Sequence, residues 1–272
     1  MINKKIIFPK NLNINLIKKF FEKKKLQILI EGSKKKARPE NQLFWSQTLA
    51  PNLFDLYRLY QFIVLNKRTT ILEFGSGWST LVISMALKEV KEKYKKNIKN
   101  FNLRRNNLFE SFCVDNEKKY LNITKKRILK FNKENKIKNP IEVHYNFSDC
   151  FIEEFEGRYS TFYKNIPLCN PDFIYLDGPN LFNIKNKINN FTTSHPDMMP
   201  MGNDIIKIEY FLTPGSIILT DGRSANARFL KDSFKRNWLY RHEEKFDQHI
   251  FYLNDPILGK INQRQLNFYK KK

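Results

Sequence analysis

The chain has 272 residues, with 49 lysines and arginines against 27 aspartates and glutamates and a formal net charge of +22. Hydrophobic residues make up 41% of it, which excludes a disordered basic tail and predicts a folded protein with a sizeable core. The three cysteines lack metal-ligand spacing, which argues against a disulfide scaffold and a zinc site. The sequence also has no apolar signal segment and no apolar run of about 20 residues, which argues against a secreted or transmembrane protein. A cytoplasmic protein is therefore expected.

Residues 1–66 are predicted to form a basic helical extension that packs on the core. Residues 11–30 place apolar side chains at helical spacing among lysines, and residues 43–65 show the same spacing with larger side chains, including Phe44 and Trp45. The first helix could instead contact an acidic membrane surface, but packing onto the domain is the preferred interpretation.

From residue 70 onwards, short apolar runs alternate with helical stretches, which predicts βαβ units and a parallel sheet. The expected strands are residues 70–74, 111–115, 141–145, 172–177 and 216–221, and the expected helices are 79–96, 117–134, 203–212 and 224–236. Two further strands, 238–243 and 249–253, predict an antiparallel hairpin at the edge of the sheet. The core domain then spans residues 67–254, and residues 255–272 are expected to be a basic C-terminal tail.

The scarce glycines gather at the ends of the predicted strands. Only nine occur in the chain, and Gly75, Gly77, Gly178 and Gly222 each follow a strand. Because ligands of open α/β sheets bind outside the carboxyl ends of the strands, these turns predict one binding cleft.

Residues 71–80 read ILEFGSGWST, a strand that runs through a glycine turn into a helix. The glycines let the backbone approach a ligand closely, and the helix start offers free N–H groups. However, Thr80 stands where a GxGxxG dinucleotide motif has its third glycine, and Glu73 would repel a pyrophosphate while suiting an ammonium group. A dinucleotide or ATP ligand is therefore disfavoured.

This segment resembles motif I of the class I S-adenosylmethionine-dependent methyltransferases, and the resemblance extends over residues 68–254. It implies an α/β fold, a doubly wound, mostly parallel seven-stranded Rossmann-like sheet with a C-terminal antiparallel hairpin. It also implies that the turn holds the amino-acid end of S-adenosylmethionine, that Asp115 binds the ribose hydroxyls and that Asp149 reaches the adenine amine. The implied cofactor site comprises Glu73, Gly75, Ser76, Gly77, Ser79, Thr80, Asp115, Asn116 and Asp149.

Two acids at neighbouring strand ends, Asp177 and Asp221, mark the expected reaction site. They resemble the metal-assisted O-methyltransferases, in which a divalent ion such as Mg²⁺ lowers the pKa of the acceptor hydroxyl. That pattern has an Asp or Asn directly after the acid of the fifth strand, whereas this chain has Gly222, so Asn226 would have to replace it. Without metal, Asp177, Asp221 and His195 are the candidates for a general base. A small hydroxylated compound, with a sugar as first choice, is the expected acceptor.

Two other functions stay open. The net charge suits an RNA or other nucleic-acid methyltransferase. However, base methylation favours an Asn/Asp-Pro-Pro-aromatic tetrapeptide, whereas residues 177–180 read DGPN. Residues 1–40 and 88–140 supply +9 and +11 of the net charge, so the basic side chains lie away from the predicted acceptor side. A NAD-dependent sugar-modifying enzyme would require a third glycine and a Tyr-x-x-x-Lys pair, which Tyr120, Tyr159 and Tyr240 do not form.

Overall fold

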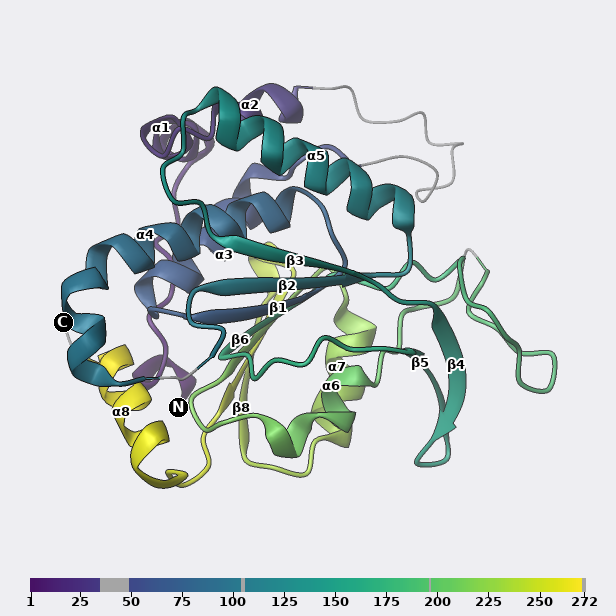
Figure 1. Ribbon diagram of the computed structural model, residues 1–272. Helices are drawn as coiled ribbons and strands as arrows, with labels where there is room; N and C mark the ends of the chain where they lie inside the picture. Colours follow the sequence, from purple (N-terminus) through teal and green to yellow (C-terminus); the bar gives the residue numbers. More distant parts are fainter. Residues whose placement is uncertain (35–48, 104–105, 196, 271–272) are drawn as a thin grey trace.

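A computed structural model describes residues 1–34, 49–103, 106–195 and 197–270 and shows a central sheet with helices on both faces (Figure 1). Its seven strands follow the order β3-β2-β1-β6-β7-β9-β8. Five are parallel, while β9 runs antiparallel to both β7 and β8. The bounds are β1 Thr70–Phe74, β2 Glu110–Asp115, β3 Glu142–Phe147, β6 Phe173–Leu176, β7 Ile217–Asp221, β8 Trp238–Glu243 and β9 Gln248–Leu253. The predicted doubly wound sheet with a C-terminal hairpin is confirmed.

The central strands are buried on both faces because their side chains alternate between two hydrophobic clusters. On β7, Ile217 and Leu219 belong to one cluster and Ile218 to the other. On β1, Ile71 joins the first cluster and Leu72 the second. This period of two is the geometry of a strand with a helix layer on each side.

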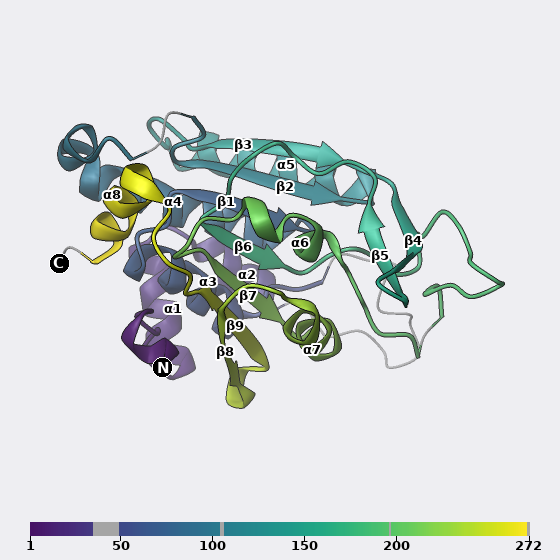
Figure 2. The ribbon, with the colours of Figure 1, turned by 90° about the horizontal axis from the view of Figure 1, so that it is seen from below.

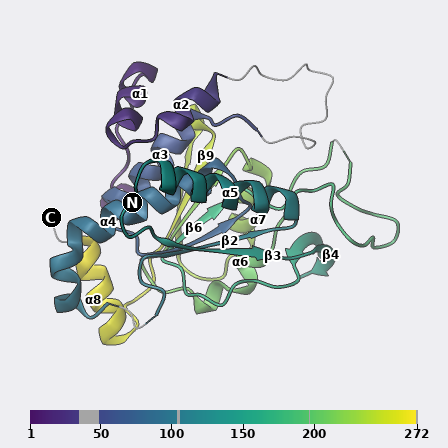
Figure 3. The ribbon, with the colours of Figure 1, turned by 45° about the horizontal axis from the view of Figure 1, so that its top comes forward.

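One face carries the helices of the N-terminal half of the chain (Figure 3). These are α1 Ile14–Lys23, α2 Gln27–Ser33, α3 Leu53–Leu65, α4 Trp78–Phe101 and α5 Lys118–Glu134. The helix expected over residues 11–30 is divided at Lys25, whose φ of 59° ends α1, and Asn13 caps α1 by accepting a hydrogen bond from the Leu16 N–H. The helix expected over 43–65 begins only after Asn52, which caps α3; Phe44 and Trp45 lie outside the described residues.

The other face carries α6 Asp204–Lys207, the 3₁₀ turn Glu209–Phe211 and α7 Ser224–Ser233 (Figure 2). A two-stranded hairpin and a helix at the chain end were absent from the sequence predictions. Strands β4 Cys150–Phe155 and β5 Arg158–Tyr163 form a separate hairpin whose turn, Glu156-Gly157, has positive φ at both residues. That is the geometry of a two-residue turn matched to the twist of a hairpin.

The expected basic tail contains helix α8 Gly259–Lys270. Phe268 is buried, and its carbonyl accepts a hydrogen bond from Lys67 Nζ at 3.0 Å. The Tyr269 hydroxyl donates to Asp172 Oδ2 at 2.6 Å. The side of α8 that carries the buried Leu266 and Phe268 is therefore packed against the protein, while Ile261 stays exposed.

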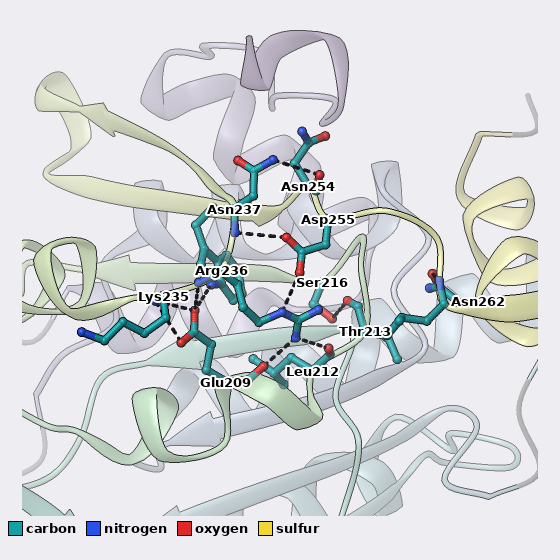
Figure 4. A network of polar contacts seen from close by, with 12 residues as sticks. Glu209, Leu212, Thr213, Ser216, Lys235, Arg236, Asn237, Asn254, Asp255 and Asn262 are labelled. Atoms are coloured by element: carbon teal, nitrogen blue, oxygen red, sulfur yellow. Dashed lines mark hydrogen bonds and ion pairs between the residues drawn. The ribbon is translucent and has the colours of Figure 1, made fainter.

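A buried polar network fixes the start of the edge hairpin (Figure 4). The Arg236 guanidinium donates to Asp255 Oδ2 at 2.7 Å and to the carbonyl oxygens of Glu209 and Leu212. The Glu209 carboxylate in turn accepts from the Arg236 N–H and from Trp238 Nε1. These bonds hold β8 in register beside the sheet.

Within the described ranges, no helix is both long and apolar enough to cross a membrane.

Candidate functional site

The glycine turn after β1 and the turn after β6 touch backbone to backbone. Gly75 has a φ of +103°, which favours glycine, and its N–H donates to the Val114 carbonyl at 2.8 Å. A Cβ atom on Gly178 would lie 2.5 Å from the Tyr163 hydroxyl and 2.6 Å from the Gly75 nitrogen. Gly178 is therefore required by a close approach of two loops and not by its own backbone angles.

We expect Gly178→Ala to destabilise the protein by roughly 2 kcal/mol or more, because overfilling a packed site typically costs 1–3 kcal/mol. Gly157→Ala is the matched control, since its added Cβ meets nothing within 4 Å and only its φ of +74° is strained. Thermal unfolding measures both. A Gly178→Ala variant that melts with the wild type would show that the two turns do not pack as described.

Glu73 lies fully buried on β1, beneath the glycine turn. One carboxylate oxygen, Oε1, accepts a hydrogen bond from the Ser79 hydroxyl, while Oε2 is buried without a partner among the described residues. Desolvation raises the pKa of Glu73 from 4.5 to about 8 against the lowering effect of the Ser79 and Thr80 hydroxyls, and the nearby Asp177 and Asp115 add to the rise. An unsatisfied buried carboxylate oxygen is costly, so this position fits a cationic hydrogen-bond donor.

Ser79 and Thr80 lie in the first turn of α4. The Thr80 hydroxyl accepts from the Gly77 N–H at 3.0 Å and so closes the start of the helix. The glycine turn, Glu73 and the first turn of α4 therefore meet at the carboxyl end of β1, as the sequence predicted.

Asp115 ends β2 and is nearly buried. Its Oδ2 accepts from the Ser76 hydroxyl at 2.6 Å and its Oδ1 from the Glu117 N–H at 2.9 Å. Burial raises the pKa of Asp115 to about 6, against the effect of these two bonds. The carboxylate thus adjoins the glycine turn, where a vicinal diol could replace the Ser76 hydroxyl.

The side-chain amide of Asn116 contacts the loop that follows β6. Its side-chain nitrogen donates to the carbonyls of Asn180 and Asn183, and its side-chain oxygen accepts from the Asn180 N–H. The amide is therefore occupied in holding the loop that follows β6. Asp149, by contrast, is half-buried after β3, and its Oδ1 lies 3.6 Å from Lys185 Nζ.

Asp177 follows β6 at the centre of the strand ends. The Arg223 guanidinium donates to the Asp177 carbonyl at 2.7 Å, and its Nε lies 3.8 Å from Asp177 Oδ1. Desolvation by the surrounding protein raises the pKa of Asp177 and Arg223 opposes this rise, but 53% of the Asp177 side chain is exposed, so solvent weakens the desolvation. Asp177 interacts electrostatically with Glu73 and Asp115 on one side and with Asp221 on the other.

Asp221 ends β7 beside a cavity of about 490 Å³. The Tyr175 hydroxyl donates to Asp221 Oδ2 at 3.3 Å. Desolvation, together with Asp55 and Asp177, raises the pKa of Asp221 to about 8. Desolvation also raises the pKa of Asp55 to about 6. The cavity is lined by Asn52, Phe54, Asp55, Asp221, Gly222, Lys245, Phe246 and Asp247.

Two predicted candidates do not join this group. Asn226 is fully buried, and its amide pairs with both the N–H and the carbonyl of Gly202 at 3.1 Å. It is thus engaged by backbone and does not fit the predicted metal ligand. The polar contacts of His195 stay within its own loop, with Asp197 and Thr193, and that loop projects beyond the β4–β5 hairpin (Figure 2).

Sequence reasoning missed the residues that reach the site from outside the parallel strands. Asp55 and Phe54 come from the start of α3, and Phe246 and Asp247 come from the turn between β8 and β9. Tyr163 comes from the unpredicted hairpin and places its buried hydroxyl, which has no hydrogen-bond partner in the described part of the chain, against Gly178. The Glu-Gly turn was the one sequence signal that pointed to that hairpin.

A seven-stranded sheet in this order, with β9 reversed between β7 and β8, is the Rossmann-like fold of the class I S-adenosylmethionine-dependent methyltransferases. No family model and no curated protein matches the chain. Solved structures with similarity include an O-methyltransferase from Bacillus cereus in complex with SAH, which is 12% identical over 94% of this chain and 100% of that one, with a TM-score of 0.40.

Two further structures are similar. The SAH-bound methyltransferase PaMTH1 from Podospora anserina is 13% identical over 91% of this chain and 100% of that one, with a TM-score of 0.43. The O-methyltransferase TomG from Streptomyces achromogenes, in complex with SAM, is 11% identical over 93% and 94%, with a TM-score of 0.37. These scores are low, so the fold assignment rests on strand order and direction.

Proposed function

We propose that the chain is an S-adenosylmethionine-dependent methyltransferase that methylates a hydroxyl group of a small acceptor, with a sugar as the first choice. The observation that carries this proposal is the buried Oε2 atom of Glu73 beneath the glycine turn, for which the described residues offer no hydrogen-bond partner. A ligand that brings an ammonium group there satisfies the oxygen and favours the charged carboxylate. A dinucleotide pyrophosphate would instead bring negative charge next to this carboxylate and disfavour its ionised form.

In this proposal each residue around the turn would contact a particular part of the cofactor. Glu73 would hold the ammonium group, Asp115 the ribose hydroxyls and Asp149 the adenine amine. Gly75 and Gly77 would let the backbone approach the amino-acid end, with Ser76, Ser79 and Thr80 beside it. In this proposal Asn116 positions the loop after β6 and does not contact the cofactor, because its amide is occupied.

When bound, S-adenosylmethionine supplies an electrophilic methyl group on a sulfonium. The protein must then hold the acceptor and remove its hydroxyl proton. Asp221 suits the role of general base, because it lines the cavity and its pKa of about 8 lies close to neutral pH. Asp221 would accept the proton of the acceptor hydroxyl, while a bound S-adenosylmethionine would supply the methyl group and leave as S-adenosylhomocysteine. Asp177, between the two halves of the site, is the second candidate for this role.

The cavity favours a neutral, polyhydroxylated ring over an anion. Its lining includes three carboxylates, those of Asp55, Asp221 and Asp247, and one cation, Lys245. Phe54 and Phe246 add apolar surface. Carboxylates accept hydrogen bonds from hydroxyls and repel phosphates. Three carboxylates against one cation among the lining residues also disfavour RNA as the acceptor. The residues predicted for Mg²⁺ do not fit the ion, since Asn226 is occupied and Asp177 faces Arg223.

Methyl transfer from S-adenosylmethionine with a radiolabelled methyl group tests the proposal. Monosaccharides and small phenols are offered in parallel with total RNA and double-stranded DNA. We expect label in a small hydroxylated acceptor and none in nucleic acid at physiological salt. Label that appears in RNA alone would reverse the choice of acceptor.

A further inference from the structure

Two of the four histidines of the chain face each other across the edge hairpin. His242 on β8 and His249 on β9 are direct partners in the antiparallel register. Their rings stack with centroids 4.0 Å apart and planes 6° apart. Cross-strand partners on one face are held close by the backbone, so both imidazoles are positioned before any ligand binds.

Asp247, in the turn between the two strands, completes a cluster. Its Oδ1 lies 3.7 Å from His242 Nε2 and 3.9 Å from His249 Nε2. These three ligand atoms all lie within 4.8 Å of one another. Ligands held about 2.1 Å from a tetrahedral zinc ion are themselves about 3.4 Å apart, so the three atoms need to approach by only about 1 Å, with the two stacked rings turning until both Nε2 atoms point at one ion.

The atoms around the cluster also suit an ion. His242 Nε2 is buried and has no hydrogen-bond partner among the described residues. The Ser224 hydroxyl, at the start of α7, lies 2.9 Å from Asp247 Oδ1 and 2.8 Å from His249 Nε2. On the far side of the ring, His249 Nδ1 lies 2.8 Å from the Tyr240 hydroxyl, which is the outer contact that fixes a metal-binding imidazole.

We propose that His242, Asp247 and His249 bind one divalent transition-metal ion, with zinc the best match to two imidazoles and one carboxylate. The fourth position is open to water or to the Ser224 hydroxyl. Imidazole ligands select such an ion over magnesium. No sign of this site was visible in the sequence, because its ligands are brought together by strand pairing and not by a metal-binding motif.

The ion would link the edge hairpin to the wall of the cavity. Asp247 lines that cavity, and its carbonyl accepts a hydrogen bond from the Gly222 N–H at 3.0 Å, next to Asp221. Ser224 begins α7 two residues further on. An ion on Asp247 would therefore hold the β8–β9 turn against the β7–α7 turn. This inference concerns binding and does not depend on the proposed methyl transfer.

Titration of zinc into the chelator-treated, full-length protein against a chromophoric competing chelator tests the site. Because the chain has only four histidines, a complete scan is possible. The wild type is expected to bind one zinc ion per chain, and magnesium should not compete. His242→Gln, Asp247→Asn and His249→Gln should each weaken binding more than about tenfold, whereas loss of an outer contact through Tyr240→Phe should cost about tenfold.

His144→Gln and His195→Gln are the controls and should leave zinc affinity unchanged. His144 is the sharper control, because it forms a comparable cluster with Glu110 and Glu142. His249 is fully buried, so if its variant fails to fold, the partly exposed His242 and Asp247 still decide the question. The site is refuted if the wild type binds no zinc at micromolar concentration, or if His242→Gln and Asp247→Asn bind it as the wild type does.

Discussion

Replacing Glu73 with glutamine is expected to abolish binding of S-adenosylmethionine while making the folded protein more stable near pH 8. The carboxylate is fully buried, and its pKa is raised from 4.5 to about 8. Folding at neutral pH therefore requires protonation of a group that is ionised in the unfolded chain. This cost grows from pH 4.5 and levels off above pH 8, where it is on the order of 4 kcal/mol.

Glutamine removes that cost, so the stability gained by Glu73→Gln should be absent near pH 4.5 and largest at and above pH 8. Denaturant unfolding at both pH values measures it. The matched control is Glu142→Gln, at an exposed carboxylate on β3, which should change neither stability nor cofactor affinity. Equal stability of Glu73→Gln and wild type at pH 8 would show that Glu73 is not held protonated.

The same carboxylate predicts a pH dependence of cofactor affinity. An ammonium group binds the ionised form of Glu73, so below pH 8 the protein must release a proton on binding. Affinity should therefore rise with pH towards 8, by at most about tenfold per unit. Calorimetry in buffers of different ionisation enthalpy counts the released proton. An affinity that falls as pH rises towards 8 contradicts the assignment.

Replacing Asp221 with asparagine should lower kcat by about 10²–10⁴-fold, which is the usual contribution of a positioned general base. Cofactor affinity should stay unchanged, because Asp221 lies at the cavity and Glu73 lies at the turn. In the wild type, kcat/KM should rise with pH through about 8, the pKa of Asp221. Steady-state rates with the acceptor found by the labelling experiment measure these effects.

A second variant distinguishes a base from a merely structural acid. Asp55 raises the pKa of Asp221, so Asp55→Asn should move the rising limb of the pH profile to lower pH. A structural role for Asp221 would leave that limb in place. Full turnover in Asp221→Asn, with loss of turnover in Asp177→Asn, would transfer the role of base to Asp177.

The sequence predicted the parts of the site that depend on local order along the chain. Each parallel strand ends at the same edge of the sheet, so Glu73, Asp115, Asp177 and Asp221 could be placed together from their positions after apolar runs. The pairing of these strands confirms that arrangement. The glycine turns were visible because glycine is scarce in this chain.

The missing parts depend on contacts between segments far apart in sequence. Asp55 reaches the cavity from α3, and Asp247 reaches it from the β8–β9 turn. Asn116 and Asn226 had the right residue type at the right distance along the chain, but packing turned their amides to backbone partners. Helix α8 lacks an apolar run, and only its contacts with the sheet show why it folds.

Parallel calorimetric titrations with S-adenosylmethionine and NAD⁺ test the central claim most directly. We expect one S-adenosylmethionine site per chain, no heat from NAD⁺, and loss of the S-adenosylmethionine signal in Glu73→Ala. Saturable binding of NAD⁺ with no binding of S-adenosylmethionine, or S-adenosylmethionine binding that survives in Glu73→Ala, would contradict the account.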